Sequence, residues 1–305
     1  MHFQPISLIE IYEVIKLLQE EFDVLILCRI LGVSRSSYYS YINKKSYVLS
    51  EKKARVGSAI KRIFKRHKSR YGWRRIQAEL SSEGIEVGRH QIRCRMMEQN
   101  LVAIQPKSYV PKTTKSHPHL RRSPNLLLET VNLPSAPNQV IVGDITYLPN
   151  EEIGYGKWLY LATWLDLKSR RIVGWHLDRH MEESLVIKAM EQVIRGRQVE
   201  KGLLVHTDGG GQYGSLAFRH LLDLHGFRQS MTRRDNHYDN AHAESLFSRF
   251  KTELLNGGVF HGLDDAYYRT FEYIEGYYNL IRRHSSIGYL SPTKYEQEFW
   301  KNVSD

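Results

Sequence analysis

Three acidic residues stand in surroundings that suit metal-dependent chemistry. Asp144 lies inside an apolar run, Asp208 follows another and precedes three glycines, and Glu244 comes after 35 intervening residues. Two hard cations about 3.5–4 Å apart can activate the attacking oxygen and stabilise the leaving oxygen in phosphoryl transfer. Carboxylate oxygens are the ligands that Mg²⁺ prefers. Each acid alone would also suit a helix cap, a turn or a surface position, but together they predict catalytic residues that bind two Mg²⁺ or Mn²⁺ ions.

Four further features surround these acids. Asn240, four positions before Glu244, shares its helical face and either orients a ligand or substrate or starts the helix. Lys251, seven positions after it, also shares that face and is either a DNA contact or a solvated lysine. The three glycines at 209–211 either let the backbone approach a phosphate or form a mobile turn. His206 follows a buried segment, which favours core packing over metal binding.

The elements that would position the acids begin at residue 139. Strand-like runs cover 140–148, 158–167, 171–178, 203–207 and 227–232, and helical runs cover 182–195, the segment up to 224, and 238–255. Three antiparallel strands followed by alternating units predict a mixed five-stranded sheet flanked by helices. This α/β order is also that of the ribonuclease-H-like fold, in which adjacent central strands bring Asp144 and Asp208 side by side.

The front of the chain has the pattern of a helix-turn-helix. Helical stripes at 8–21 and 24–30 precede Gly32, which suits a tight turn, and Ser34, which can cap the next helix. Arg35 and Ser36 would then start a recognition helix, where side chains reach base edges. A plain helical hairpin fits the same pattern.

A second helical unit follows a strongly basic run. Eleven Lys or Arg and no acidic residue lie between positions 52 and 75. Two helices are expected, at 77–82 and from 87 to about 100, with Gly84 breaking the first. We expect a set of arginines to face outward: Arg74, Arg75, Arg89, Arg93 and Arg95. Of these, Arg74 and Arg75 are candidate DNA contacts. The predicted organisation is a helix-turn-helix at 1–50, a basic helical unit at 51–104, a basic linker at 105–130 and a catalytic domain at 131–300.

Charge separates the two halves of the chain. The net charge is +11; residues 1–125 carry 24 Lys and Arg against 10 Asp and Glu, whereas residues 126–305 carry 20 against 23. An unmixed basic front half indicates a polyanion partner, here DNA. No apolar run is long enough for a membrane span, no secretory signal is evident, and the two cysteines have no paired spacing. A reducing cytoplasm therefore suits the chain.

The motifs resemble those of the second-frame transposase (OrfB) of the insertion-sequence-three family, in the retroviral-integrase-like DDE superfamily. The resemblance is carried by positions 144–147, 206–213, 230–232, 239–241, 244–247, 251–253, 277–279, 283–285 and 291–292. It implies DNA strand cleavage and strand transfer at the terminal inverted repeats of a mobile element, followed by insertion into target DNA. It also implies that Lys251 meets the DNA end.

The resemblance further implies partners and a location. The expected partners are double-stranded DNA, further copies of the chain on that DNA, and a fused or separate protein from an upstream reading frame, with no membrane. The expected location is the bacterial cytoplasm, at the nucleoid. Two rival functions remain at this point. One is a catalytically silent DNA-binding repressor, which loss of an acid would favour, and the other is a nuclease without joining activity.

Overall fold

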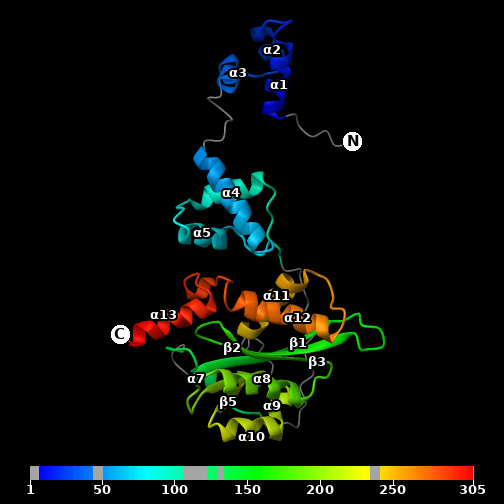
Figure 1. The fold of residues 1–305 in the computed structure, drawn as a ribbon, viewed down its shortest axis with the longest axis vertical. Coiled ribbons are helices and arrows are strands. Elements are labelled where there is room, and N and C mark those ends of the chain that lie inside the picture. Colours follow the sequence, from blue (N-terminus) through cyan, green and yellow to red (C-terminus); the bar gives the residue numbers. More distant parts are fainter. Residues whose placement is uncertain (1–6, 44–50, 106–121, 130–133, 234–240, 305) are drawn as a thin grey trace.

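The computed structural model describes residues 7–43, 51–105, 122–129, 134–233 and 241–304 (Figure 1). The N-terminal unit consists of α1 (Leu8–Leu18), α2 (Val24–Ile30) and α3 (Arg35–Ile42), and the basic unit of α4 (Glu51–Arg66), α5 (Trp73–Ser82) and α6 (Arg89–Glu98). The strands of the core are β1 (Val140–Pro149), β2 (Trp158–Asp166), β3 (Ile172–Asp178), β4 (Leu204–Thr207) and β5 (Arg228–Met231). Its helices are α7 (Leu126–Glu129), α8 (Glu183–Gly196), α9 (Gly211–Gly214), α10 (Leu216–Leu224), α11 (Ala241–Leu255), α12 (Leu263–Phe271), the π-helix η2 (Glu272–Tyr278), the 3₁₀ turn η3 (Ser285–Ile287) and α13 (Pro292–Ser304).

The N-terminal unit has the expected helices and turn. Ser34 caps α3 by accepting a bond from the backbone N–H of Ser37 at 3.0 Å. Gly32 adopts a φ of +68°, a left-handed conformation that glycine takes without strain. A small cluster that includes Tyr12, Ile15 and Tyr38 forms the core of the unit. Local capping and the turn glycine therefore determine this arrangement.

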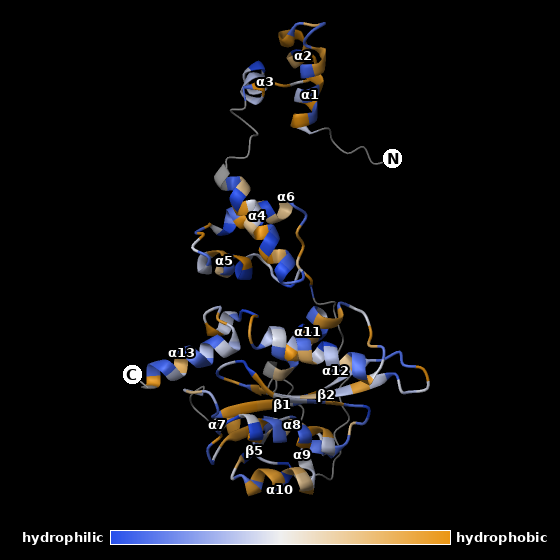
Figure 2. Ribbon diagram, viewed as in Figure 1, coloured by the Kyte–Doolittle hydropathy of each residue, from blue (hydrophilic) through white to orange (hydrophobic). Residues whose placement is uncertain are grey.

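In the basic unit, the charged run turns out to be a helix with one apolar side. Val56, Ile60, Ile63 and Phe64 of α4 are buried together with residues of α5 and α6. In Figure 2 the ribbon of α4 alternates between blue and orange accordingly. The seven Lys and Arg residues of α4 obscured this helix in the sequence, because their number dominates the local hydropathy.

The sheet has the strand order β3-β2-β1-β4-β5. β1 pairs antiparallel with β2, β2 pairs antiparallel with β3, and the pairs β1–β4 and β4–β5 are parallel. This confirms the predicted mixed sheet, and every predicted strand and flanking helix of the core has a counterpart. β1 is central, so both of its edges are paired.

Alternate residues of β1 serve two separate cores. Val140 and Val142 pack with α11, α12 and η2, whereas Ile141 packs with α8 and α10 on the other face. Figure 1 shows α11 and α12 on one side of the sheet and α8 and α10 on the other. The side chain of Asp144, in phase with Val140 and Val142, consequently belongs to the face that α11 covers.

The end of the expected linker is part of the core. Residues 106–121 lie outside the described residues, but residues 122–129 pack along β5. The Met231 N–H donates to the Pro124 carbonyl at 3.2 Å, and the Leu126 N–H donates to Ser230 Oγ at 3.0 Å. The expectation of a linker through residue 130 is therefore wrong for this stretch. The physical reason is that β5 is an edge strand whose free backbone groups need partners.

The basic unit docks on the core through buried polar contacts around Glu253, which lies near the end of α11. Arg282 donates to Glu253 from Nε at 2.8 Å and from Nη2 at 2.6 Å, and the Tyr273 hydroxyl donates to it at 2.9 Å. From the basic unit, the Arg75 guanidinium lies 3.9 Å from the Glu253 carboxylate, and Arg70 donates to the Glu253 carbonyl at 3.0 Å.

A second set of contacts reinforces this junction. Arg283 donates from Nε to Glu79 at 2.6 Å, and its backbone N–H donates to the Tyr71 hydroxyl at 2.8 Å. The Arg70 guanidinium lies 4.5 Å from the centre of the Tyr277 ring. Arg282, in the segment after η2, is 1% exposed and therefore belongs to the interior of this junction.

No helix in the described part of the chain is long and apolar enough to cross a membrane.

The junction yields the first prediction. Arg282→Ala leaves Glu253 buried without its main partner, and breaking a buried pair in this way costs about 3–5 kcal/mol of unfolding free energy. The matched control is Arg195→Ala, which removes an exposed arginine paired with Glu191 and should change stability little. Urea unfolding of both variants measures the difference.

The same experiment carries a pH dependence. Burial raises the pKa of Glu253, but its bonds with Arg282 outweigh burial and leave that pKa below the usual carboxyl range. The stabilisation is therefore complete above the usual range and is lost as pH falls through the lowered folded pKa. The difference in unfolding free energy between wild type and Arg282→Ala should become smaller at acidic pH. A difference that is small at neutral pH, or the same at every pH, would contradict the stabilising role of the pair.

Candidate active site

The two aspartates lie side by side on adjacent parallel strands, Asp144 in the middle of β1 and Asp208 directly after the end of β4. In the register of β1 with β4, Gly143 lies opposite Thr207, so Asp144 and Asp208 are the next residues on each strand. Asp144 Oδ1 accepts from the Ile145 N–H at 2.8 Å, and Asp208 Oδ1 accepts from the Gly210 N–H at 3.0 Å. Parallel pairing therefore places both carboxylates at one point on the sheet.

The residue before Asp144 must be small. A Cβ on Gly143 would lie 2.2 Å from the ring of Trp164, which is fully buried against Phe218 on the opposite face of the sheet. This close packing fixes the backbone of β1 next to the carboxylate. The glycine thus permits the tight layer behind the site.

Helix α11 brings the other two charged residues over Asp144. Ala243, Leu246, Phe247 and Phe250 bury the opposite side of the helix against the sheet. Glu244 is exposed on α11, and its charge acts on Asp144. The ammonium of Lys251 also acts on Asp144, from two helical turns further along.

The site concentrates negative charge in a partly buried place. Burial raises the pKa of the Asp144 carboxyl well above its usual range, and the charges of Asp208 and Glu244 raise it further. The Ile145 N–H and Lys251 oppose this shift only in part. Burial likewise raises the pKa of Asp208. Like charges this close favour a bound cation or a proton.

This charge balance is the observation that tests whether the residues fit a metal ion. Asp144 and Asp208 offer oxygen ligands, and Glu244 can add a third from α11. Within the described ranges no three acidic, histidine or cysteine side chains already converge on a single point. The carboxylate pair nevertheless has the chemistry of a divalent-metal site, because a hard cation stabilises both buried carboxylates and relieves the repulsion that helps to raise the pKa of Asp144.

Arg122 is a site residue that the sequence did not indicate. Its guanidinium lies where a Cβ on Gly209 would be, at 2.3–2.6 Å, and its positive charge lowers the pKa of Asp208. The first of the three glycines thus makes room for an arginine, a third use beside the two expected ones. Arg122 comes from a proline-containing basic stretch, and only the packing of that stretch on β5 brings it to the site.

The remaining candidates are divided by the structure. Arg35, Ser36 and Arg74 are exposed, and Asn240 lies outside the described residues.

Arg75 does not face outward as expected. Its Nε donates to the Arg283 carbonyl at 3.0 Å within the junction with the core. Arg95 also departs from the expectation: its side chain is 14% exposed and pairs with Glu98. His206 is fully buried and bonds Ser230 Oγ at 2.8 Å, as core packing requires.

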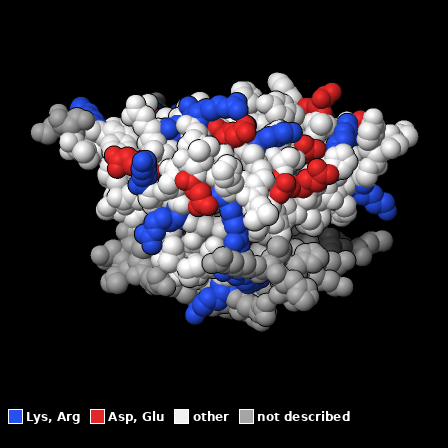
Figure 3. All heavy atoms as spheres, turned by 90° about the horizontal axis from the view of Figure 1, so that it is seen from below, with Lys and Arg blue, Asp and Glu red and all other residues white. Residues whose placement is uncertain are grey.

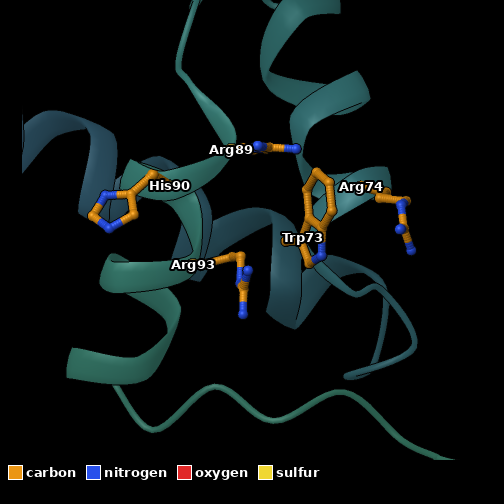
Figure 4. Close-up of a pocket in the computed structure, with 5 residues that line it drawn as sticks. All are labelled: Trp73, Arg74, Arg89, His90 and Arg93. Carbon is orange, nitrogen blue, oxygen red and sulfur yellow. The ribbon is translucent and has the colours of Figure 1, made fainter.

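A basic groove lies between α5 and α6. It has a cavity volume of about 650 Å³ and is lined by Trp73, Arg74, Arg89, His90 and Arg93. Figure 4 shows Arg89 and Arg93 of α6 directed toward Trp73 of α5. The Arg74 guanidinium lies 4.7 Å from the centre of the Trp73 ring. The groove combines cations with an aromatic face, which suits a nucleic acid.

The core presents a different surface. Figure 3 shows the core from below, where basic and acidic side chains of the described residues intermingle. This agrees with the near-neutral balance of residues 126–305. The visible part of this face therefore has no uniform basic patch comparable to the groove.

Comparison with known proteins agrees with this geometry. Two families described as integrase core domain match residues 134–237 and 225–292, and one described as HTH-like domain matches residues 51–109. The insertion element IS600 uncharacterized 31 kDa protein of Shigella sonnei is 36% identical over 90% of this chain and 98% of its own length. Transposase InsF for insertion sequence IS3A of Escherichia coli (strain K12) is 35% identical over 92% of this chain and 96% of its own.

Among solved structures, the HTLV-2 integrase catalytic core domain in complex with magnesium is similar, at 18% identity and a TM-score of 0.39. The similarity covers 53% of this chain and 98% of that one.

The sheet order, the paired aspartates and the integrase core match define a polynucleotidyl transferase of the DDE class, whose reaction depends on divalent metal. With relatives of this identity along almost its whole length, the chain belongs to the IS3 family of insertion-sequence transposases. It binds DNA and acts in DNA transposition.

The crowded carboxylates generate the second prediction. Asp144→Asn removes a charge that is unfavourable in the metal-free fold, so its melting temperature in EDTA at neutral pH should exceed that of the wild type. Mg²⁺ should raise the melting temperature of the wild type and have little effect on the variant. Thermal unfolding with EDTA or Mg²⁺ measures both effects.

The sign of the pH dependence follows from the raised pKa. In the metal-free wild type, stability falls as pH rises from the usual carboxyl range through the raised folded pKa of Asp144. The stability of Asp144→Asn should not fall over this pH range, because the variant has no carboxyl group to titrate there. The control is Asp178→Asn at the end of β3, where Lys188 lies 3.8 Å away and the lost charge is a favourable one. Equal melting temperatures of wild type and Asp144→Asn at every pH would remove Asp144 from a charge-crowded site.

Proposed function

We propose that Asp144, Asp208 and Glu244 are the catalytic metal ligands of this transposase and that they hold two Mg²⁺ or Mn²⁺ ions. The observation that carries the proposal is that Asp144, in the middle of β1, lies beside Asp208 at the end of β4, beneath α11. When bound, the metals activate the attacking oxygen and stabilise the leaving one. The protein itself fixes two of the carboxylates on rigid strands, supplies the third from a helix, and brings Lys251 and Arg122 beside them.

The proposed reaction has two steps. Water attacks a phosphodiester at the end of the element, the bond to the 3′ oxygen breaks, and a 3′-OH is released. That 3′-OH attacks a second phosphodiester, and a new bond forms as the 3′ oxygen on the far side of the attacked phosphorus leaves. Each step exchanges one P–O bond for another, so the chemistry requires no protein–DNA covalent intermediate.

Recognition of the terminal inverted repeats is assigned to the helical units. In the basic unit, α5 and α6 have the order of a helix-turn-helix, and Arg89, His90 and Arg93 occupy the first turns of α6. Side chains at this place in a recognition helix reach base edges. Arg74 beside the groove, and Arg35 and Ser36 at the start of α3, are proposed as further DNA contacts. Arg75 would contribute indirectly, through the junction with the core.

Further partners are proposed on the basis of the family. Two ends must be cut and joined in one complex, so more than one copy of the chain is expected on the DNA. A protein from an upstream reading frame, fused or separate, is an additional partner. The setting is the bacterial cytoplasm, where the DNA is the nucleoid.

The decisive experiment compares the three acids in one assay, which is the third prediction. Asp144→Asn, Asp208→Asn and Glu244→Gln keep side-chain shape but lose the charge that holds the metals. Each should abolish nicking and joining of labelled inverted-repeat DNA in Mg²⁺ or Mn²⁺ while DNA binding survives. Asp178→Asn is the control and should cleave normally.

The assay also separates the rival functions. Wild-type protein that binds ends but neither nicks nor joins them would be a DNA-binding repressor. Nicking without joining would make it a nuclease. Near wild-type cleavage by any one of the three variants would exclude that residue from the site.

The fourth prediction concerns Lys251. Burial lowers its pKa while Asp144 raises it, so its ammonium lies close to the carboxylates and beside any DNA that the metals hold. Lys251→Ala should bind metal as well as the wild type and lose discrimination between a matched end and a duplex with altered terminal base pairs. The control is Lys294→Ala, an exposed lysine of α13 paired with Glu298. Unchanged rate and discrimination in Lys251→Ala would leave it an ordinary helix lysine.

A further inference from the structure

A second basic pocket lies at the junction between the basic unit and the core. Its cavity volume is about 250 Å³. Its cationic lining comes from four parts of the chain: Arg75 from α5, Arg170 from the turn between β2 and β3, Arg249 from α11, and Arg282 from the segment after η2. Hydroxyl groups of Ser245, Ser285 and Ser286 complete the polar lining. Among the described residues that line the pocket, none is Asp or Glu.

The base of the pocket is held rigidly. Arg282 is fixed by its two bonds to Glu253, which leaves Nη1 directed at the ring of His284, with 3.2 Å to Nε2. Burial, and then the charges of Arg282 and Arg75, keep the pKa of His284 well below its usual range. The imidazole is therefore neutral and accepts from Arg282.

The mouth of the pocket is open to a ligand. Arg249, Ser285 and Ser286 are exposed, and among the described residues Arg249 has no acidic partner. Arg170 is half-buried, and burial lowers the pKa of its guanidinium. Buried or half-buried arginines below and an exposed arginine above suit the tetrahedral oxygens of a phosphate, which arginine binds through paired N–H donors.

The pocket shares α11 with the metal site. Glu244 and Lys251 lie on one flank of the helix, whereas Ser245 and Arg249 lie four residues apart on the other. Glu244 and Arg249 are separated by about 7.5 Å along the helix axis, roughly two steps of a DNA strand at about 3.4 Å each. A duplex lying across the exposed ridge of α11 would reach both flanks at once.

We propose that this pocket binds a phosphate of the DNA whose strand is cleaved at the metal site, within a few nucleotides of the cleaved bond. The proposal rests on the proposed function and extends it to a phosphate-binding site built jointly by the basic unit and the core. The phosphate is either an internal phosphodiester or the 5′-terminal phosphate of an end, since both present the same oxygens. Binding it would hold the two parts of the protein on one DNA segment.

The fifth prediction tests the pocket with the full chain. Affinity for the duplex inverted repeat is measured by fluorescence anisotropy between about 50 and 200 mM salt, where lost phosphate contacts reduce the salt dependence. Arg249→Ala should reduce the slope of log affinity against log salt by about one and weaken binding about tenfold. Ser286→Asp, which places a negative charge at the mouth, should act in the same direction.

A control is matched to Arg249→Ala: Arg195→Ala removes an exposed arginine from α8 on the opposite side of the sheet and should bind as the wild type does. Ser286→Asn separates size from charge and should weaken binding less than Ser286→Asp. Methylphosphonate replacement of single phosphates then locates the contact: one position should weaken wild-type binding but not weaken Arg249→Ala further. A site at the 5′ terminus should instead respond to removal of the terminal phosphate.

The outcomes separate the pocket from the proposed function. Equal salt slopes for Arg249→Ala and Arg195→Ala, or a full additional loss at every methylphosphonate position in Arg249→Ala, would overturn the pocket. Cleavage by wild-type protein on the same duplex is scored in parallel. Absence of that cleavage, together with a distinct Arg249→Ala slope, would remove the proposed function and retain the pocket as a phosphate site.

Discussion

The ion pair between Glu253 and Arg282 is the constraint on which the arrangement of the functional parts depends. A fully buried pair is costly to desolvate, and a well-packed apolar pair can be equally stable. The pair instead specifies how the elements are arranged. The contacts of Glu253 with η2, with the turn that follows it and with α5 form only when these elements meet α11 at one point. Glu244, Lys251 and Arg249 lie on the same helix as Glu253. Apolar residues of α11 pack it on the sheet, and contacts from both the core and the basic unit hold the end of the helix that carries Glu253.

How much the sequence predicts follows from the range of the forces involved. The strands, their order along the chain and the caps could be predicted, since hydrophobic alternation and turn residues act over a few positions. The placement of Asp144 beside Asp208 could be predicted only because that order is also the order of the ribonuclease-H-like fold. The roles of Arg75, Arg122 and Arg282 could not. Arg75 and its acceptor Arg283 are 208 positions apart, and an arginine that pairs inside the fold is indistinguishable in sequence from one that meets DNA. The helix α4 was missed for a related reason, because basic side chains around an apolar stripe resemble a solvated run.

The proposed metal site differs from other buried charged groups of the core in how far its charge is balanced by partners. Elsewhere, buried charge is matched: Glu296 receives Arg171 and Arg197, and Asp166 receives the N–H groups of Asn138, Lys168 and Ser169. At Asp144 and Asp208 the charge is left unmatched, although Arg122 and Lys251 stand near enough to reduce it. Such a site weakens the metal-free fold, and the surrounding packing of Trp164 behind Gly143 holds it in place. The same unmatched charge that favours cation binding lowers the stability of the metal-free protein, and active sites commonly combine these two effects.

Docking of the basic unit on α11 also fixes the distance between the basic groove and the acidic site. Hydrogen bonds join the basic unit, with its groove between α5 and α6, to α11 and to the segment after η2. Under the proposed function, in which the groove recognises the inverted repeat and the acidic site cuts it, this junction would set the number of base pairs between the recognised sequence and the cut. A base pair inserted or deleted between the two points would then rotate the recognised pairs away from α6.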